Sequence, residues 1–569
     1  MRALAWWLRG GLLLLALLMV GACSVNTTVS ATGSTPSQVQ HLYLTVTQVW
    51  LNSSATAAPT DSGWVGEKLS QPQTFDLATL GAGTLATLVS GVKTPPGIYR
   101  QVQLVLADSA DALTSSASSA GLTWNAQVQY LDAAGSSLTL PLELPARAAP
   151  VVVPVAISIS AGGVLPMMTG ATTSTTDSST GDSTSVSTVA TTTDGTTAVI
   201  SVAVDVDAVR NFLLFDYGNA VGAMLSVAPA ACDLAKAGAI SGTLDLSAVP
   251  GDVPTGAQGI VVTAERLSAD GSRYEAVKSV AVSSGGAFTL YPLPLADTGS
   301  TSYEVVIHGP AIRTVIISQV PVVKGAAADA TLLQSSALKL IAARSFLIDT
   351  AANSARLPAG AHVGLYQTVP GFNVPHLVEY QGLDPFNGGL AARLSLSADA
   401  LDHGAWSSGA DISFSTVAPD EGAGTYRIGA SAPLWAPSTL SGTLSAPGDS
   451  TTAVQPLFLP VLGTAQGGAL GLDGTLDLGS AGRFDRGFVL VSRGGQLVEA
   501  VDLTAALAGL SASPRFTVPV LPAGVTGTRY DVSVRLWNSL DPAGSLARAS
   551  ASAPVDASRG AQSITISVR

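Results

Sequence analysis

Short stretches in which apolar and polar residues alternate run along almost the whole chain, separated by glycine, proline and small polar residues. Leu42, Leu44 and Val46, for example, alternate with tyrosine and threonine. A period of two places the apolar residues on one face of a β-strand. Long segments with a helical period are scarce, and the 58 glycines and 32 prolines indicate frequent turns. At about 100–200 residues per domain, the pattern predicts an all-β chain of several tandem β-sandwich domains.

The beginning of the chain has the pattern of a secretion signal. Arg2 and Arg9 precede a leucine-rich apolar run at 12–20, which ends in two small residues and Cys23. A run of about ten apolar residues is roughly half of what a membrane-spanning helix needs. We therefore expect residues 1–22 to be a signal peptide that is removed on maturation.

The four residues Val20-Gly21-Ala22-Cys23 resemble the lipobox of bacterial lipoproteins. In that family the cysteine thiol is diacylglycerated, the signal is cleaved before the cysteine, and the new amino group is acylated. The resemblance implies a protein of the bacterial cell envelope that reaches its membrane through lipidated Cys23. Ser24 stands where an aspartate would indicate the inner membrane, so the outer membrane is favoured. An ordinary secretory signal with a chance cysteine is the alternative.

After the lipidated cysteine, residues 23–38 are mostly serine, threonine and other polar residues. Such a composition stays extended and solvated. We expect a flexible tether here, with a reach of about 50 Å when fully stretched.

Charge and cysteine content exclude several classes of protein. The chain has 27 Lys+Arg and 39 Asp+Glu, and removal of Arg2 and Arg9 leaves 25 against 39, a mature net charge of −14. Charged residues form only 12% of the chain, and no basic run stands out, so nucleic acid is not an expected partner. Once Cys23 carries lipid, Cys232 has no second cysteine for a disulfide. Stability must come from apolar cores.

The first predicted domain covers residues 39–232. It has a strand that ends near Trp50, then Phe75-Asp76-Leu77, then Pro96-Gly97-Ile98-Tyr99 before a strand, and finally Val204-Asp205-Val206-Asp207. This order resembles domain-of-unknown-function family 4382 over about residues 38–217, which implies a fold and an envelope location but no chemistry. Residues 169–197 are rich in Thr and Ser and have almost no apolar residues to bury, so we expect a disordered loop between two strands.

Two later segments share one pattern of motifs. Residues 238–332 contain an opening Gly242-Thr-Leu, a Phe288-Thr-Leu strand and a Tyr303-Glu-Val-Val-Ile strand. This order resembles the carboxypeptidase-regulatory-like β-sandwich of the carbohydrate-binding-like fold. Gly474, Phe516 and Tyr530 repeat the motifs, with spacings of 42 and 14 residues against 46 and 15 in the first copy. We expect residues 438–569 to be a second copy, with a further β domain at 335–437 between them.

No metal or cofactor site is expected. The histidines His41, His308, His362, His376 and His403 include no i, i+4 pair. Asp205 and Asp207 share one face of a strand, and Asp420-Glu421 lie in a glycine-rich loop. Calcium between such carboxylates is one interpretation, but solvent-facing carboxylates and a simple turn explain them too.

The same sequence predicts no catalysis. A Gly-x-Ser-x-Gly elbow in a strand-to-helix context is missing, and nothing singles out a serine for a triad. We therefore expect a structural, adhesive or ligand-binding role, with an envelope protein or a glycan as possible partner. A glycan would stack on exposed aromatic rings. The first candidates for such a contact are Trp406 and Trp435, and the further candidates are Trp124, Tyr366 and Tyr380. Packing of these rings in the cores is the plainer interpretation. An envelope hydrolase with a site at a domain junction is the second alternative.

Overall fold

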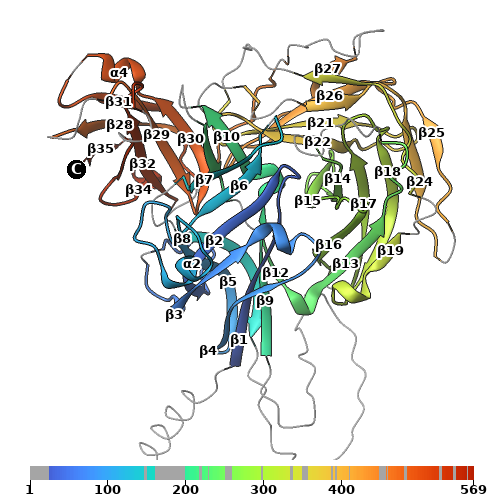
Figure 1. Cartoon of the computed structure of the whole chain (residues 1–569), viewed down its shortest axis with the longest axis horizontal. Helices are drawn as coiled ribbons and strands as arrows, with labels where there is room; N and C mark the ends of the chain where they lie inside the picture. Colours follow the sequence, from blue (N-terminus) through green and yellow to red (C-terminus); the bar gives the residue numbers. More distant parts are fainter. Residues whose placement is uncertain are drawn as a thin grey trace, which may run out of the picture.

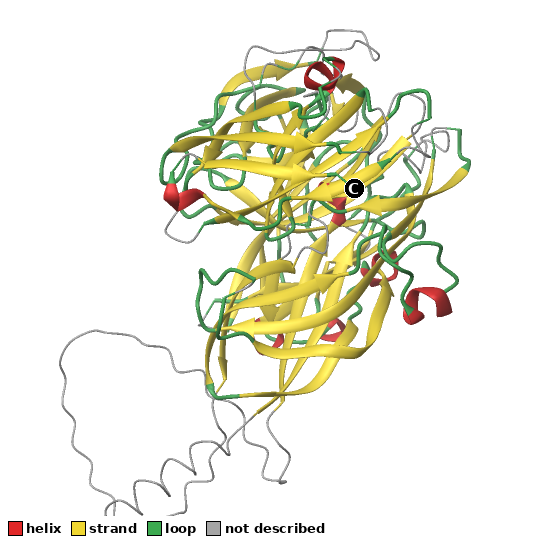
Figure 2. Ribbon diagram, turned by 90° about the vertical axis from the view of Figure 1, so that its left-hand side faces the viewer, coloured by secondary structure: helices red, strands yellow, loops and turns green. Residues whose placement is uncertain are grey.

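Four β-sandwich units follow one another along the chain in the computed structural model of the protein (Figure 1). The few helices are single turns (Figure 2), and none in the described part of the chain has the length and hydropathy needed to cross a membrane. The structure describes residues 25–568 apart from 60, 133, 146–149, 160–198, 217–220, 228–229, 250–258, 297–298, 334–337, 349–356, 386–388, 391–393, 409–410, 447–456, 458, 480–483, 510, 525–527, 542–545 and 561. The predicted signal peptide 1–22, Cys23 and the Thr/Ser-rich segment 169–197 lie outside the described residues.

The N-terminal unit packs a four-stranded sheet, in the order β12-β9-β1-β4, against an eight-stranded sheet that contains the path β10-β11-β7-β6-β2-β5-β8. Leu42, Leu44 and Val46 are 0–1% exposed, so the alternation in the sequence does place one face of β2 in the core. The strands are β1 (Val25–Ser34), β2 (Val39–Asn52), β3 (Val65–Asp76), β4 (Ala86–Thr94), β5 (Gly97–Leu106), β6 (Gln127–Leu131), β7 (Ser137–Glu143), β8 (Pro150–Ile159), β9 (Val199–Asp207), β10 (Phe212–Asp216), β11 (Val221–Leu225) and β12 (Ala230–Asp233), with the short helices η1 (Leu77–Leu80), α2 (Ser115–Ser119), α3 (Ala208–Asn211) and η2 (Leu234–Lys236).

Strand β1 corrects the expectation of a flexible tether over residues 23–38. It lies inside its sheet, parallel to β9 and antiparallel to β4, and Val29 and Ala31 are 1% and 0% exposed. The polar residues of β1 are compatible with a strand because the two neighbouring strands pair with its backbone on both sides. The described fold therefore begins two residues after Cys23.

The second unit has a three-stranded sheet, β16-β13-β19, and a six-stranded sheet, β15-β14-β17-β18-β24-β25. The last two strands, β24 and β25, lie in residues that the sequence predicts to be part of the third domain. They belong to this sheet because β24 pairs in parallel with β18. The strands are β13 (Ala237–Thr243), β14 (Val261–Leu267), β15 (Tyr274–Ala281), β16 (Ala287–Pro294), β17 (Ser300–His308), β18 (Val315–Val323), β19 (Thr331–Leu333), β24 (Leu401–Ala405) and β25 (Ser415–Val417), with the turn η3 (Ala327–Asp329).

The third unit packs the sheet β22-β21-β26-β27 against the pair β20-β23. The domain boundary expected at 437/438 lies further along the chain, because β27 still pairs with β26 and the next sheet begins with Ala469. The strands are β20 (Ser345–Ile348), β21 (His362–Gln367), β22 (His376–Gly382), β23 (Leu394–Ser397), β26 (Thr425–Ser431) and β27 (Ser441–Ser445).

The C-terminal unit has the sheets β31-β28-β35 and β30-β29-β32-β33, with β34 also paired to β32. The strand order matches β16-β13-β19 and β15-β14-β17-β18 of the second unit, element for element. The elements are β28 (Ala469–Asp477), β29 (Arg486–Arg493), β30 (Gln496–Asp502), α4 (Thr504–Ala508), β31 (Arg515–Pro522), β32 (Arg529–Trp537), β33 (Ala547–Ser550), β34 (Val555–Asp556), η5 (Ala557–Arg559) and β35 (Gln562–Ser567).

The repeated motifs occupy equivalent places in these two sandwiches. Gly242 lies opposite Phe288, and Gly474 lies opposite Phe516, in the same antiparallel pair of strands. A Cβ on Gly474 would lie 2.0 Å from Cζ of Phe516, so the glycine makes room for the ring. Both phenylalanines are buried, at 4% and 6% exposure. The spacing of the motifs therefore follows from one shared packing arrangement.

Replacement of Phe516 by alanine should lower the free energy of unfolding by about 3–5 kcal/mol, because it empties a ring-sized space in the core. Val520, on the same strand, is 38% exposed, so Val520→Ala is a matched control with an expected change of about 0.5 kcal/mol or less. Urea denaturation of both variants measures the difference. Equal losses of unfolding free energy in the two variants would show that the ring of Phe516 does not stabilise the core.

Candidate functional site

The N-terminal unit contacts the other three units, and its contacts with the second and third meet around α3. Arg210 of α3 donates a hydrogen bond to the backbone oxygen of Ala276 in the second unit and lies 5.5 Å from the ring centre of Tyr380 in the third. Ser34, at the end of β1, donates a 2.6 Å hydrogen bond to the backbone oxygen of Ser279. The junction of these three units is therefore the place where side chains from distant parts of the sequence converge.

The two carboxylates considered for calcium lie at this junction and are not solvent-facing. Asp205 is 7% exposed and accepts a 2.7 Å hydrogen bond from the ammonium of Lys278, which is itself buried. Asp207 forms an ion pair with Arg210. Burial raises the pKa of Asp205, and Lys278 opposes that shift. Each carboxylate therefore has a cation of the protein as its counter-ion, which corrects the expectation of a solvated pair.

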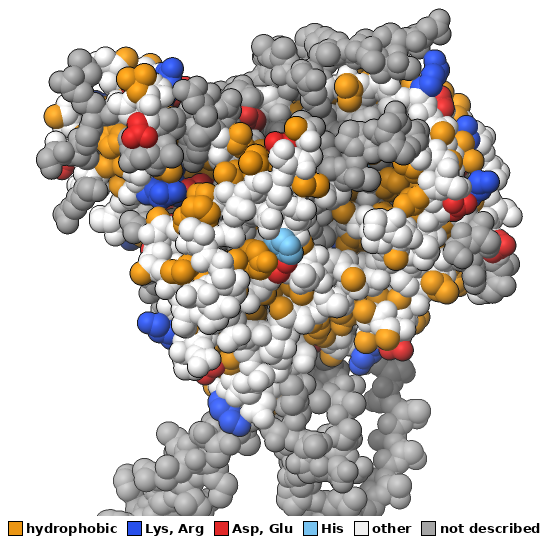
Figure 3. All heavy atoms as spheres, in the orientation of Figure 1, with side chains coloured by type: hydrophobic (Ala, Val, Ile, Leu, Met, Phe, Trp, Pro, Cys, Tyr) orange, Lys and Arg blue, Asp and Glu red, His pale blue; other side chains and the backbone are white. Residues whose placement is uncertain are grey.

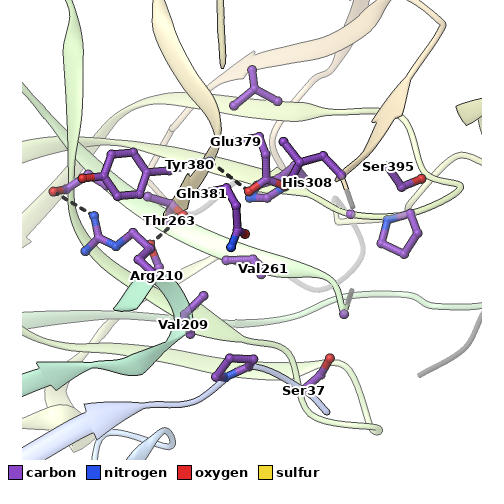
Figure 4. Close-up of a pocket in the computed structure, with 18 of the residues that line it drawn as sticks. Ser37, Val209, Arg210, Val261, Thr263, His308, Glu379, Tyr380, Gln381 and Ser395 are labelled. Atoms are coloured by element: carbon purple, nitrogen blue, oxygen red, sulfur yellow. Dashed lines mark hydrogen bonds and ion pairs between the residues drawn. The ribbon is translucent and has the colours of Figure 1, made fainter. Parts of the chain in front are cut away.

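A cavity of about 140 Å³ lies among the three units (Figure 4). One side carries a contact between His308 and Glu379, with 3.2 Å between Nδ1 and Oε2. Another side carries Arg210, whose charge is already balanced by Asp207. The walls combine polar and apolar side chains, and they include Ser37, Val209, Val261, Thr263, Tyr380, Gln381 and Ser395. The cavity is therefore a small site of mixed polar and apolar character at the junction of the three units.

Two glutamates and a histidine are buried together between the second and third units. Glu265 and Glu304 face each other across β14 and β17, at 0% and 7% exposure. His376 of β22 is 0% exposed, and its Nε2 lies 3.6 Å from Oε2 of Glu304. Oε1 of Glu265 has no hydrogen-bond partner among the described residues. Burial raises the pKa of Glu265 well above its usual value, and Glu304 adds to this shift, so Glu265 holds a proton readily.

A second histidine at the junction is kept neutral. His362 stacks on Tyr380 with 4.7 Å between ring centres. Burial, together with the nearby charge of Arg210, lowers the pKa of His362 to about 4. The ring therefore packs as an uncharged aromatic group at neutral pH.

One serine–histidine contact is present, although the sequence singled out no such pair. Oγ of Ser318 lies 3.2 Å from Nε2 of His403, on the neighbouring strands β18 and β24. Ser318 is 1% exposed, so a substrate cannot reach its hydroxyl without opening the sheet. The contact joins two strands rather than forming a nucleophile at a surface.

The N-terminal and C-terminal units meet around one buried carboxylate. Glu143 is 2% exposed and forms ion pairs with Arg535, at 2.9 Å, and with Arg548. Burial alone would raise the pKa of Glu143, but the two guanidinium groups hold it below its usual value. The residues are about 400 positions apart in the chain. No spacing rule along the sequence could have paired them.

The five candidate aromatic residues do not form one surface. Trp406 is half-buried and packs against the core of the second unit. Trp435 is half-buried and lies in a bridge to Ala465. Tyr366 is 5% exposed, Tyr380 lines the cavity described above, and Trp124 is half-buried in the N-terminal unit. A glycan role for Trp406 and Trp435 stays a prediction.

Of the two acidic residues in the glycine-rich loop, Asp420 is exposed and Glu421 is engaged. Glu421 accepts hydrogen bonds of 2.8 Å from both the backbone nitrogen and the hydroxyl of Thr368, so it fastens its loop. Among the residues that the structure describes, no group of three or more His, Cys, Asp or Glu side chains is arranged to hold a metal ion. Cys232 is buried, and this burial raises the pKa of its thiol to about 12.

The variant Glu143→Gln should lose about 3–5 kcal/mol of stability, because buried Arg535 and half-buried Arg548 both lose the charge that Glu143 supplies. Glu67→Gln, at an exposed position of β3, is the control and should have almost no effect. Since the pKa of Glu143 is lowered on folding, its contribution is present above about pH 4.5 and is lost as the pH falls through the folded value. Thermal melts of both variants across this range test the assignment, and equal melting temperatures would contradict it.

The effect of Glu265→Gln on stability should change with pH in the direction opposite to that of Glu143→Gln. The pKa of Glu265 is raised on folding, so its favourable contribution is complete below its usual pKa of 4.5 and is lost as the pH rises. Glutamine does not titrate, and the variant should gain stability relative to the wild type as the pH increases. Glu275→Gln, whose side chain is 53% exposed, is the control on the adjacent strand. A difference in melting temperature that stays constant with pH would show that Glu265 does not titrate in this range.

Comparison with known proteins adds one family to these observations. The model of the family "Domain of unknown function (DUF4382)" matches residues 24–160. No curated protein matches the chain. Among solved structures, the chain is similar to "Structure of the Streptococcal ancillary pilin", at 10% identity over 58% of this chain and 99% of that one, with a TM-score of 0.15. It is also similar to "Crystal structure of tetra-tandem repeat in extending region of large adhesion protein", at 10% identity over 94% of this chain and 100% of that one, with a TM-score of 0.10. The matched family covers most of the N-terminal unit, which is therefore similar to DUF4382 domains.

Proposed function

We propose that the protein is a lipid-anchored component of the bacterial cell envelope with a structural or adhesive role and no catalysis. The observation that carries this proposal is the set of buried contacts that joins all four units. Domains in one chain move relative to one another unless the interface is large and well packed. Here an apolar cluster of the N-terminal, third and C-terminal units includes Phe215, Ala359, Phe488 and Trp537. A rigid body of this kind suits a scaffold better than a machine with moving parts.

Hydrogen bonds between the units support the same interpretation. The backbone nitrogen of Ala359 in the third unit donates to Glu499 of the C-terminal unit, at 3.2 Å. The backbone nitrogen of Tyr274 in the second unit donates to the backbone oxygen of Pro375, at 2.9 Å. Such contacts fix the angle between neighbouring sandwiches, so the loops at the ends of the array keep their positions relative to the anchor.

The chemistry of the junction supports a role without catalysis. Asp205 and Asp207 are paired with cations, Glu265 and Glu304 are deeply buried, and the serine of the Ser318–His403 contact is inaccessible. A nucleophile or general acid must reach the substrate to act. The junction cavity of about 140 Å³ would hold only a small molecule.

Lipid anchoring can be tested with a fatty-acid analogue in living cells. Wild-type protein should carry the label and sediment with the membrane fraction, and Cys23→Ser should lose both properties. Cys232→Ala removes the other thiol, which is buried, and should remain labelled. Labelling of Cys23→Ser at the wild-type level would refute the anchor.

The scaffold role has a separate test. Cells without the protein should lose attachment to surfaces or resistance to detergent, and the wild-type gene should restore the lost property. The Cys23→Ser form should not restore it, because it is no longer held at the envelope. Restoration by the Cys23→Ser form would show that the role does not depend on the anchor.

A further inference from the structure

We propose that one end of the N-terminal unit rests on anionic lipid headgroups of the membrane that holds Cys23. This end, called the basal end, consists of the beginning of β1 and residues 93–100 at the turn between β4 and β5. The inference depends on the lipid anchor proposed above and adds the surface that the anchor brings to the bilayer.

The strand register gathers these residues at one end of the sandwich. Val25, the first residue of β1, lies opposite Thr94, the last residue of β4. Val199, the first residue of β9, lies opposite Asn26, and Gly97 lies opposite Ile159, the last residue of β8. Figure 1 shows β1, β4 and β9 reaching the lower end of the molecule, whereas the C-terminal unit lies at the upper left. The anchor therefore enters the fold at the basal end.

The length of chain between the lipid and the fold leaves little room for separation. Only Ser24 lies between Cys23 and Val25, and each of the two steps along the chain spans at most about 3.6 Å. The first strand therefore starts within about 7 Å of the lipidated cysteine. A polar headgroup layer is about as thick as this, so the basal end cannot leave it.

The side chains at the basal end suit such a surface. Pro95, Pro96 and Ile98 are exposed, and Ile98 keeps 55% of its surface open to solvent. Lys93 and Arg100, on either side of them, are also exposed. A small apolar tip flanked by cations is the composition expected of a segment at a membrane interface.

The local charge contrasts with the rest of the chain. Residues 25–34 and 86–100 contain no Asp or Glu, although the whole chain carries 39 of them. Figure 3 shows Lys or Arg side chains at the lower tip, beside the grey residues. A basic residue near an anionic bilayer is attracted to it, and an acidic residue is repelled. The acidic protein thus turns a locally basic end toward the lipid.

The turn is also held in shape. The hydroxyl of Tyr99 donates a 2.9 Å hydrogen bond to the backbone oxygen of Pro95. The ammonium of Lys93 donates a 2.7 Å hydrogen bond to the side chain of Asn26 on β1. The basic and apolar groups are therefore presented together with the start of β1.

A polarity-sensitive probe on the anchored protein tests the contact. Ile98→Cys is labelled with an NBD dye, and the lipidated protein is reconstituted into phosphatidylglycerol-containing vesicles. Buried Cys232, with its raised pKa, should not react. Leu540→Cys, at a residue 91% exposed in the C-terminal unit, is the matched control. We expect a blue shift and quenching by headgroup-labelled lipid at position 98, and neither at position 540.

Charge reversal separates the contact from the anchor. Lys93→Glu with Arg100→Glu should reduce the quenching at position 98 several-fold, while the protein still floats with the vesicles. Arg486→Glu with Arg515→Glu, at exposed positions of the C-terminal unit, changes the net charge equally and should leave the quenching unchanged. The proposal would be overturned if the protein floats with the vesicles but the dye at position 98 is quenched no more than the dye at position 540. It would also be overturned if the two double variants change the quenching at position 98 equally. Loss of flotation in the unreversed protein would instead refute the anchor.

Discussion

Glu143 keeps its charge inside the protein only because two arginines from the far end of the chain surround it. A buried carboxylate without a partner is costly, so the N-terminal and C-terminal units must meet in the register that brings Arg535 and Arg548 to Glu143. The pair Asp205–Lys278 places the same constraint on the N-terminal and second units. Four sandwiches that each have their own core are thereby held in a single arrangement. The rigidity on which the proposed role rests follows from a few paired charges as well as from apolar area.

Within two of the sandwiches, a glycine and a phenylalanine set the arrangement. The ring of Phe288 covers Gly242, and the ring of Phe516 covers Gly474, across the same pair of strands. A tyrosine on the opposite sheet then donates its hydroxyl to the backbone oxygen of a proline, Tyr303 to Pro294 in one copy and Tyr530 to Pro522 in the other. These contacts do not depend on the length of the loops between the strands. The spacings of the motifs can therefore differ by a few residues between the two copies.

The local pattern of the sequence was sufficient to predict the fold class, because alternation in segments such as 42–46 is a property of neighbouring residues. The repeat was also visible, since Gly242, Phe288 and Tyr303 have counterparts at similar spacing. The tether was mispredicted because polar composition indicates solvation only when no strand is available to pair with, and β9 supplies one about 170 residues later. The junction could not be predicted, because Asp205 meets Lys278, and Glu143 meets Arg535, only through the packing of whole domains.

The parallel pairing of β18 with β24 has a consequence for biogenesis. Because a chain is synthesised from its N-terminus, the edge of the second sandwich at Val315 stays unpaired until Asp402 has been made. An open edge of this kind is a template for pairing with other chains. The second sandwich thus cannot be completed in order of emergence, and its neighbour must close it. Until the third unit has supplied β24, the second sandwich is therefore open to pairing with other chains.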